Sequence, residues 1–158
     1  MAKLKTNAMR ILDTQKVQYE ILTYDANDGK IDGVAVAGKI GKDPAQVYKT
    51  LVAVGASKNL YVFIIPVEAE LDLKKAAREA GEKNVEMLPV KDIQKFTGYI
   101  RGGCSPIGMK KNYPTFLDVS AQSLETMIVS AGKIGFQVEL APEELLKAAT
   151  GKYAPIIK

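Results

Sequence analysis

Histidine is absent from all 158 residues of the chain. Catalytic arrangements in which an imidazole activates a serine or a cysteine are therefore excluded, as are histidine-ligated metals and a histidine-based pH switch. A zinc site built from several cysteines is excluded too, because Cys104 is the single cysteine. Acid–base chemistry would fall to Lys, Asp, Glu, Tyr, backbone amides or the substrate itself.

Long hydrophobic segments are also missing. The longest apolar run, Leu60 to Val67, has the length of a strand and falls far short of the roughly 18 residues that a membrane span needs. The first ten residues, MAKLKTNAMR, lack the apolar core of a signal peptide. A single cysteine is typical of a reducing compartment. We therefore expect a cytoplasmic protein with no membrane partner.

The charge balance is mildly basic, with 22 Lys and Arg against 18 Asp and Glu, a net charge of +4 and a pI of about 9.0. This balance fits a polyanionic partner, although many ordinary cytosolic proteins share it. The length predicts one domain over residues 1–158. Neither a GxGxxG fingerprint nor a GxxxxGK[ST] loop occurs, and we expect no cofactor and no metal.

Helical periodicity and capping residues alternate along the chain with short β patterns. The expected helices, the first with Asn7 as its cap, cover Ala8–Leu12, Val34–Ile40, Pro44–Tyr48, Asp72–Ala80, Val90–Thr97 and Pro142 to about Gly151. The expected strands cover Val17–Tyr24, Thr50–Gly55, Leu60–Pro66, Val85–Met87, Thr115–Asp118, Thr126–Ser130 and Phe136–Leu140. Because no regular βαβ rhythm appears, the fold class is α+β: a mixed, mostly antiparallel sheet of six or seven strands flanked by helices.

The segment Gly98 to Pro114, GYIRGGCSPIGMKKNYP, differs from the rest of the chain. It holds four glycines, two prolines and three basic residues in seventeen positions. Glycines allow close approach of a ligand and let backbone N–H groups turn toward an anion or a developing oxyanion. An ordinary surface loop with solvated charges is the competing interpretation. This loop is the best candidate site.

Three single residues carry possible chemistry, and each has a plainer alternative. Lys49 enters the first strand of the predicted hairpin, where it is either a surface lysine or a cation that holds a phosphate or ester oxygen. Tyr24 ends a strand, where it either packs or stacks on a base. Cys104 has no histidine to activate it, so a small buried hydrophobic role is favoured over a nucleophile.

Several separated motifs together resemble one known family. They are QVYKTLV (46–52), LDLKKAA (71–77), VEM (85–87), GYIRGGCSPIGMKK (98–111), PTFLD (114–118) and VSAGKIGFQVEL (129–140). In this order they resemble the YbaK family of Cys-tRNA(Pro) deacylases, relatives of the bacterial prolyl-tRNA synthetase editing domain and of EbsC-type proteins. The resemblance runs from about Asn7 to Lys152. It implies a mixed sheet that is partly barrel-like and flanked by helices.

The resemblance also implies roles for individual residues. The implied catalytic residues are Lys49, Gly102 and Gly103. The implied substrate-binding residues are Tyr24, Arg101, Ser105, Pro106, Gly108, Ser130 and Gln137. The chain departs from the family pattern at Cys104, where an aliphatic residue is usual, and at Gln137, where close relatives carry an acidic residue.

The activity implied is the removal, in trans, of cysteine mischarged on tRNA(Pro). With no histidine available, the economical mechanism is attack by the substrate's own thiol on its ester carbonyl, assisted by glycine-loop amides. The implied partners are the 3′ end of an aminoacyl-tRNA and a prolyl-tRNA synthetase, and no DNA. Two alternatives stay open: a deacylase for another small amino acid, such as Ala-tRNA(Pro), and a non-catalytic module that binds tRNA or a protein partner.

Overall fold

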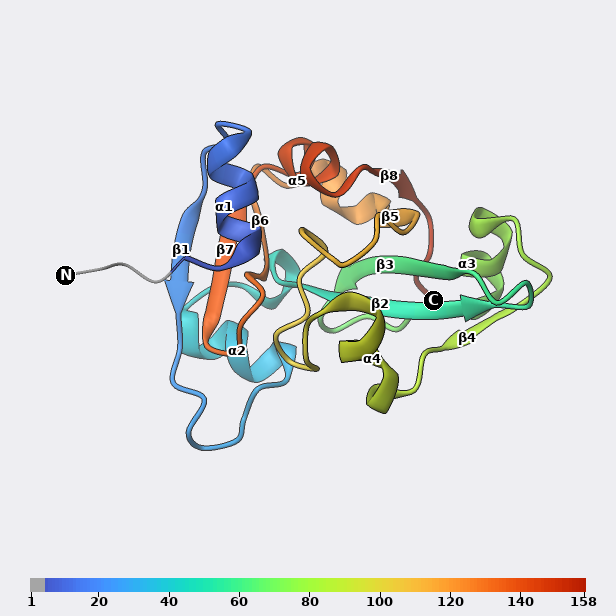
Figure 1. The fold of residues 1–158 in the computed structure, drawn as a ribbon. Coiled ribbons are helices and arrows are strands. Elements are labelled where there is room, and N and C mark those ends of the chain that lie inside the picture. Colours follow the sequence, from blue (N-terminus) through green and yellow to red (C-terminus); the bar gives the residue numbers. More distant parts are fainter. Residues whose placement is uncertain (1–4) are drawn as a thin grey trace.

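The computed structural model describes residues 5–158, in which helices surround two β-sheets (Figure 1). The α-helices are α1 (Asn7–Thr14), α2 (Gly33–Ile40), α3 (Leu73–Ala80), α4 (Val90–Thr97) and α5 (Pro142–Ala149). The 3₁₀ helices are η1 (Pro44–Gln46) and η2 (Val119–Ser123). The strands are β1 (Glu20–Thr23), β2 (Tyr48–Gly55), β3 (Leu60–Pro66), β4 (Val85–Met87), β5 (Thr115–Asp118), β6 (Met127–Ser130), β7 (Phe136–Leu140) and β8 (Gly151–Ala154).

The described strands divide into a three-stranded sheet of order β1-β7-β6 and a five-stranded sheet of order β4-β2-β3-β5-β8. Only β3–β5 and β5–β8 pair in parallel, so the expected α+β class with mostly antiparallel pairing is confirmed. The expected single sheet of six or seven strands is corrected in two ways. The strands form two sheets, which do not close into a barrel, and β8 after α5 was not expected.

The helix ends follow local capping chemistry, with one correction at the first helix. The hydroxyl of Thr6, not the expected Asn7, caps α1 by accepting from the Met9 N–H at 3.2 Å. Asn7 is instead the first helical residue, and its amide donates to the Gly108 carbonyl at 3.2 Å. The expected helix Pro44–Tyr48 is only the 3₁₀ turn η1, because Tyr48 already begins β2.

Both faces of the five-stranded sheet are buried, and strand β3 shows how. Val62 and Ile64 point into the main core, which also contains residues of α1, α5 and the three-stranded sheet. Tyr61, Phe63 and Ile65 point to the opposite face, which packs against α3. There Phe63 stacks on Phe116 with ring centroids 5.3 Å apart. Because both faces of the sheet are buried at β3, this strand is one continuous run of apolar residues.

The two sheets meet along one edge of β2. The Val67 N–H donates to the Val47 carbonyl at 2.9 Å, and the Gly55 N–H donates to the Asn59 carbonyl at 2.8 Å. By the alternation of an antiparallel ladder, the backbone groups of Tyr48 and Thr50 point away from β3, toward the other edge of β2. On that edge β4 pairs with residues 53–55, and β6 makes one isolated parallel bridge, Val47–Ile128.

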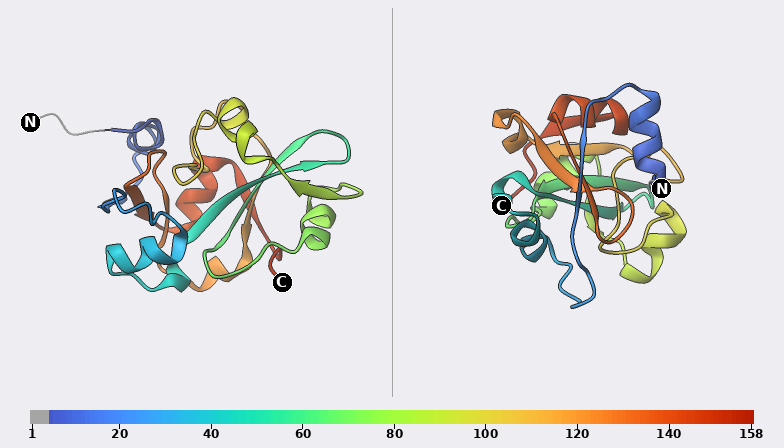
Figure 2. Two further views of the ribbon diagram at one scale, coloured as in Figure 1. Left: turned by 90° about the horizontal axis from the view of Figure 1, so that it is seen from below. Right: turned by 90° about the vertical axis from the view of Figure 1, so that its left-hand side faces the viewer.

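This arrangement leaves an interval of the β2 edge, centred on Thr50, that pairs with no described strand. We call it the edge gap of β2. Figure 2 shows the hairpin of β2 and β3 extending away from the three-stranded sheet, with α2 beside the start of β2 and the loop after α4 approaching from the other side. The edge gap therefore lies where α2, that loop and the ends of both sheets converge.

Candidate functional site

A small pocket of about 100 Å³ occupies the edge gap of β2. Its lining comes from both sheets, from α2 and from the loop after α4. The lining residues are Ile31, Gly33, Val36, Val47, Tyr48, Lys49, Thr50, Val67, Gly102, Cys104, Ser130 and Gln137. The pocket is small, so it suits a compact group such as a short side chain.

Lys49 is the one basic residue in the pocket lining, and no carboxylate accompanies it. None of the four ion pairs found within residues 5–158 involves Lys49. A half-buried ammonium without a bound carboxylate stabilises a negatively charged or strongly polarised oxygen, such as a phosphate or an ester carbonyl. The sequence-predicted role of Lys49 as a cation at a strand mouth is consistent with this placement.

The glycine loop approaches the pocket at Gly102. This residue has φ +88°, which favours glycine, and a Cβ built on it would lie 2.7 Å from Ile31 Cδ1. Gly103 plays a different part, since its N–H already donates to the Ile100 carbonyl at 3.0 Å and a Cβ would meet the Ile134 backbone nitrogen at 2.9 Å. Gly103 thus serves a turn and close backbone packing, and only Gly102 of the two lines the pocket.

Ser130 and Gln137 reach the pocket together because they are cross-strand partners in the β6–β7 ladder. Gln137 is buried, at 6 % exposure, and Ser130 is half-buried. The Ser130 hydroxyl accepts from the Gly132 N–H at 3.4 Å. Both side chains are neutral, so this wall supplies hydrogen-bonding groups without adding charge. Four sequence-predicted site residues, Lys49, Gly102, Ser130 and Gln137, are therefore brought to one pocket.

The other sequence-predicted site residues do not line this pocket. Ser105 is fully buried, and its hydroxyl accepts from the Ile107 N–H at 3.2 Å. Pro106 and Gly108 line a separate hollow between α1, α5 and the far end of the loop. Arg101 is exposed next to Gly102. Tyr24 lies at the end of β1, where its N–H donates to the Gly135 carbonyl at 3.0 Å and Lys39 Nζ lies 5.7 Å from its ring centroid.

Sequence reasoning missed Thr50 and the apolar walls of the pocket. The hydroxyl of Thr50 is buried and has no hydrogen-bond partner within residues 5–158, and the same is true of the Tyr24 hydroxyl. Buried polar groups are normally paired, so the Thr50 hydroxyl is available to a ligand or a water molecule. The position of Thr50 directly after Lys49 is the only sequence signal. Nothing in the sequence indicates that Val36 and Val67, from α2 and the turn after β3, would close the pocket.

Cys104 lines the pocket, but its thiol is poorly suited to nucleophilic attack. Burial raises the pKa of Cys104 from 9.0 to about 11, an effect that a hydrogen bond with Thr97 only partly offsets. The thiolate is the reactive form, and at neutral pH a thiol with that pKa is ionised to about one part in ten thousand. The expectation that Cys104 is a small buried hydrophobic residue agrees with its 9 % exposure.

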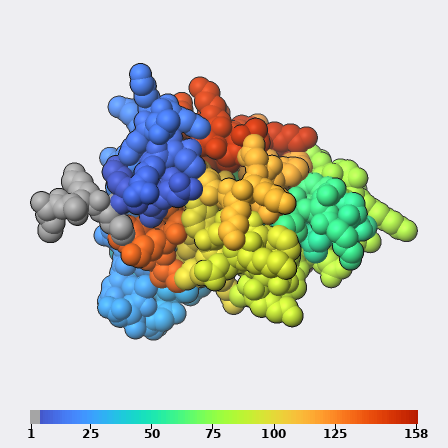
Figure 3. All heavy atoms as spheres, viewed as in Figure 1, coloured from blue at the N-terminus to red at the C-terminus, as the bar shows by residue number. Residues whose placement is uncertain are grey.

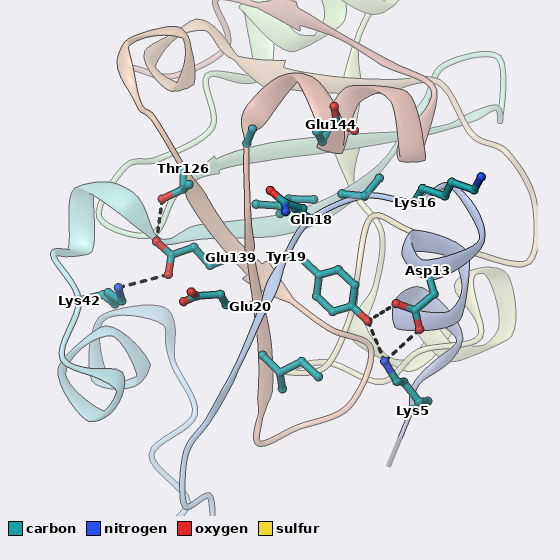
Figure 4. Close-up of a pocket in the computed structure, with 14 residues that line it drawn as sticks. Lys5, Asp13, Lys16, Gln18, Tyr19, Glu20, Lys42, Thr126, Glu139 and Glu144 are labelled. Atoms are coloured by element: carbon teal, nitrogen blue, oxygen red, sulfur yellow. Dashed lines mark hydrogen bonds and ion pairs between the residues drawn. The ribbon is translucent and has the colours of Figure 1, made fainter. Parts of the chain in front are cut away.

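A much larger open groove, of about 1,110 Å³, lies between α1, β1, β7 and α5 (Figure 4). Several of its polar side chains pair with one another. Lys5 bonds Asp13 at 2.9 Å, and Lys42 bonds Glu139 at 3.2 Å. The Tyr19 hydroxyl also donates to Asp13, at 2.8 Å. Paired charges along an open groove are less suited to catalysis than the free cation in the small pocket.

Two absences apply to residues 5–158 only. In this part of the chain, no group of three or more His, Cys, Asp or Glu residues could hold a metal ion. Over the same residues, no helix combines the length and the apolar character required to cross a membrane.

The fold and the pocket together define a class: an α+β protein with a small cationic pocket, free of carboxylates, where two sheets meet. Comparison with known sequences then identifies the family. The sequence model of the family described as "Aminoacyl-tRNA editing domain" matches residues 32–148, and the chain belongs to that family. The matched segment includes Lys49, Gly102 and the rest of the pocket except Ile31.

Individual relatives agree with this assignment. The chain is 48% identical over 152 residues to a protein of Enterococcus faecalis named "Putative Cys-tRNA(Pro)/Cys-tRNA(Cys) deacylase EbsC", covering 96% of this chain and 93% of that protein. It is 29% identical over 100 residues to the proline–tRNA ligase of Shouchella clausii, covering 63% of this chain and 17% of the ligase.

A crystal structure described as "a putative trans-editing enzyme for prolyl tRNA synthetase" superposes with a TM-score of 0.84 over 99% of both chains, at 23% identity. At that identity the superposition supports the fold alone. The sequence-based resemblance to the editing family is therefore confirmed by sequence and by fold.

Proposed function

We propose that this protein is a trans-editing deacylase that removes cysteine mischarged on tRNA(Pro). The observation that carries the proposal is the small pocket in the edge gap of β2, where Lys49 is the single basic residue of the lining. The 48% identity to the Enterococcus faecalis protein supports the choice of substrate. Cysteine and proline are similar in size, so a synthetase pocket separates them poorly, and a second sieve supplies the discrimination.

The nucleophile in this proposal is the thiol of the substrate. Its sulfur attacks the ester carbonyl carbon of the same cysteinyl group, and the bond between that carbon and the 3′-oxygen of the tRNA breaks. The 3′-oxygen takes up a proton, which gives tRNA with a free 3′-hydroxyl and a small cyclic thioester. Water later opens the thioester to cysteine, so the net reaction is a hydrolysis. A free thiol with a pKa of about 8.5 is already a few per cent ionised near neutral pH.

The protein contributes position and charge to this step. Lys49 would lie against the ester or the terminal phosphate and stabilise the developing negative charge. The backbone of Gly102 would approach the carbonyl closely, because no side chain intervenes there. Thr50, Ser130 and Gln137 would hold the amino and hydroxyl groups of the substrate. The raised pKa of Cys104 supports assigning the nucleophile to the substrate.

Prolyl-tRNA synthetase is proposed as the source of the mischarged tRNA. The support for this partner is the 100-residue similarity to a proline–tRNA ligase, which places a related sequence inside a synthetase of that specificity. A free-standing editing protein would act on tRNA after its release or during hand-over. A pull-down with purified prolyl-tRNA synthetase, with and without tRNA(Pro), tests the hand-over.

The deciding experiment measures the ester remaining on Cys-, Ala-, Ser- and Pro-tRNA(Pro) after incubation with the purified protein. We expect rapid loss of cysteine, slow loss of the others, and no loss when the substrate thiol is methylated. Equal rates for alanine and cysteine would show that no thiol is needed and would favour a deacylase for small amino acids in general. Binding of tRNA with no cleavage of any ester would favour a non-catalytic module. The Lys58→Met variant, which alters a lysine of the β2–β3 turn far from the pocket, is the control for Lys49→Met.

A further inference from the structure

The net charge of the chain is concentrated in one segment. Residues 90–112, which comprise α4 and most of the glycine loop, contain five basic residues and one acidic residue. That segment alone accounts for the chain's net charge of +4, so the other positions balance to zero. The basic residues are Lys91, Lys95, Arg101, Lys110 and Lys111, and all five are exposed.

Hydrogen bonds hold the returning limb of the loop, residues 108–113, against α4. The loop leaves α4, passes the pocket at Gly102 and returns to the last turn of the helix. There the Lys110 N–H donates to the Thr97 carbonyl at 3.1 Å, and Lys110 Nζ donates to the Lys95 carbonyl at 3.2 Å. The Tyr113 hydroxyl fixes the same limb by donating to the Phe96 carbonyl at 2.7 Å. Figure 3 shows α4 and this limb side by side on one face of the molecule.

The cations on this surface are available to an external ligand. None of the four ion pairs found within residues 5–158 uses any of the five basic residues. Asp92, in the first turn of α4, is the one carboxylate of the segment. Arg101 adjoins Gly102, so the surface begins one residue from the pocket wall. We call these five side chains and the backbone that carries them the basic surface.

We propose that the basic surface is the docking surface for the phosphate backbone of the tRNA acceptor arm; this rests on the proposed function. In the proposed function the pocket receives the aminoacyl group, so the nucleotides that carry it would lie next to the pocket mouth. An eight-residue helix is about 12 Å long, so together with the returning part of the loop it can lie along more than one phosphate of a strand. Contacts to phosphates alone do not read sequence, so this surface would accept many tRNAs.

The salt dependence of tRNA binding tests this assignment without relying on catalysis. Uncharged tRNA is titrated with the triple variant Lys91→Gln/Lys95→Gln/Lys111→Gln between 50 and 200 mM salt, and binding is followed by fluorescence anisotropy. Arg101, which is proposed to bind substrate, is left intact. Each lost phosphate contact lowers the slope of log K against log salt by about 0.7 to 0.9. We therefore expect the slope to fall by about 2 to 3 relative to the wild type.

A second triple variant is the matched control. Lys74→Gln/Arg78→Gln/Lys83→Gln removes the same charge from α3 and the turn after it, at the far end of the five-stranded sheet (Figure 1). Its slope should equal that of the wild type. Equal losses in both triple variants would show that only net charge matters, and an unchanged slope in the first variant would equally overturn the docking surface.

A short substrate separates this inference from the proposed function. Cysteinyl-adenosine carries the ester but no acceptor-arm phosphates. The first triple variant should cleave it at the wild-type rate while its KM for Cys-tRNA(Pro) rises. A wild-type protein that binds tRNA with the expected slope but cleaves neither ester would disprove the deacylase activity and leave the docking surface standing. A variant with wild-type KM for Cys-tRNA(Pro) would disprove the docking surface and leave the activity standing.

Discussion

Gln46 donates through Nε2 to Glu139 Oε2 at 2.9 Å, across 93 positions of sequence. Gln46 ends the 3₁₀ turn that leads into Lys49, and Glu139 lies two residues after Gln137 on β7. The Thr126 hydroxyl donates to the same carboxylate oxygen at 2.6 Å. This contact holds the strand that carries Lys49 against the sheet that carries Ser130 and Gln137, and so it fixes the two halves of the pocket.

The Glu139 contact predicts a pH-dependent contribution to stability. Burial acts to raise the pKa of Glu139, but hydrogen bonds from Thr126 and Lys42 outweigh it and hold the pKa below its usual value. The folded-state pKa thus lies below the unfolded value of about 4.3, so ionised Glu139 stabilises the fold above that pH. The contribution is lost as the pH falls through the folded-state pKa.

Urea unfolding of the wild type and of Glu139→Gln at several pH values measures this contribution. The difference in unfolding free energy should be largest above about pH 5 and shrink below about pH 4. Glu86→Gln, which changes an exposed carboxylate on β4, should show no such trend. A difference for Glu139→Gln that stays constant from pH 7 to pH 3 would rule out an ionised role for this carboxylate.

Lys49→Met should slow deacylation of Cys-tRNA(Pro) by about 30- to 1,000-fold, with the fold intact. The reason is the loss of about 2–4 kcal/mol of electrostatic stabilisation of the transition state. Single-turnover rates measure the effect directly, and Lys58→Met should match the wild type. A folded Lys49→Met protein with wild-type rates would remove Lys49 from the mechanism.

Cys104→Ala should leave the deacylation rate within about twofold of the wild type. Burial raises the pKa of this thiol to about 11, and the proposed mechanism uses the substrate's thiol. Slow alkylation of the native protein by iodoacetamide, followed by mass spectrometry, checks the low thiolate content. An inactive Cys104→Ala protein, together with equal cleavage of Ser- and Cys-tRNA(Pro), would assign the nucleophile to the protein.

Thr50→Val should raise the free energy of unfolding and lower the activity. The buried Thr50 hydroxyl has no partner within residues 5–158, and an unpaired buried hydroxyl costs on the order of 1–3 kcal/mol. Replacing it with a methyl group of the same shape removes that cost together with a group able to hold substrate. The control Thr115→Val should destabilise, because the Thr115 hydroxyl donates to the Tyr113 carbonyl at 2.9 Å. Destabilisation by Thr50→Val would indicate an existing partner for its hydroxyl.

Lys39 organises the loop that brings Ile31 over Gly102. Its ammonium donates to the Asp25 and Lys30 carbonyls at 2.6 and 2.9 Å and pairs with Asp28 at 2.7 Å. Lys39→Met should therefore speed amide hydrogen exchange in residues 26–31 by at least about tenfold, without affecting β2 and β3. Unchanged exchange in the loop would show that its own turns suffice to hold it.

The elements set by local chemistry were predictable from the sequence. The apolar run of β3 and its turn to β2 gave the hairpin, and Asp72 and Gly81 marked the ends of α3, where both act as caps. β8 was not predictable, because it has four residues and forms only by parallel pairing with β5. The cap at Thr6 was missed because Asn7, an equally good capping residue, follows it directly.

The candidate site was only partly predictable, for a related reason. Lys49 and Gly102 stood out through their motifs, but the pocket depends on Val47 bridging Ile128, 81 positions away, which no local pattern encodes. The same limit applies to Gly103. Its sequence context suggests an amide free to bind an oxyanion, and the turn to Ile100 that occupies this amide is visible only in three dimensions.

The edge gap of β2 has a consequence for how the activity responds to damage elsewhere. The pocket takes walls from both sheets and belongs to neither, so it is complete only in molecules whose sheets are docked. A substitution that loosens the Val47–Ile128 contact would then lower the fraction of competent molecules, meaning those with a complete pocket. Apparent affinity would fall in proportion to that fraction, while each competent molecule would turn over substrate at the original rate.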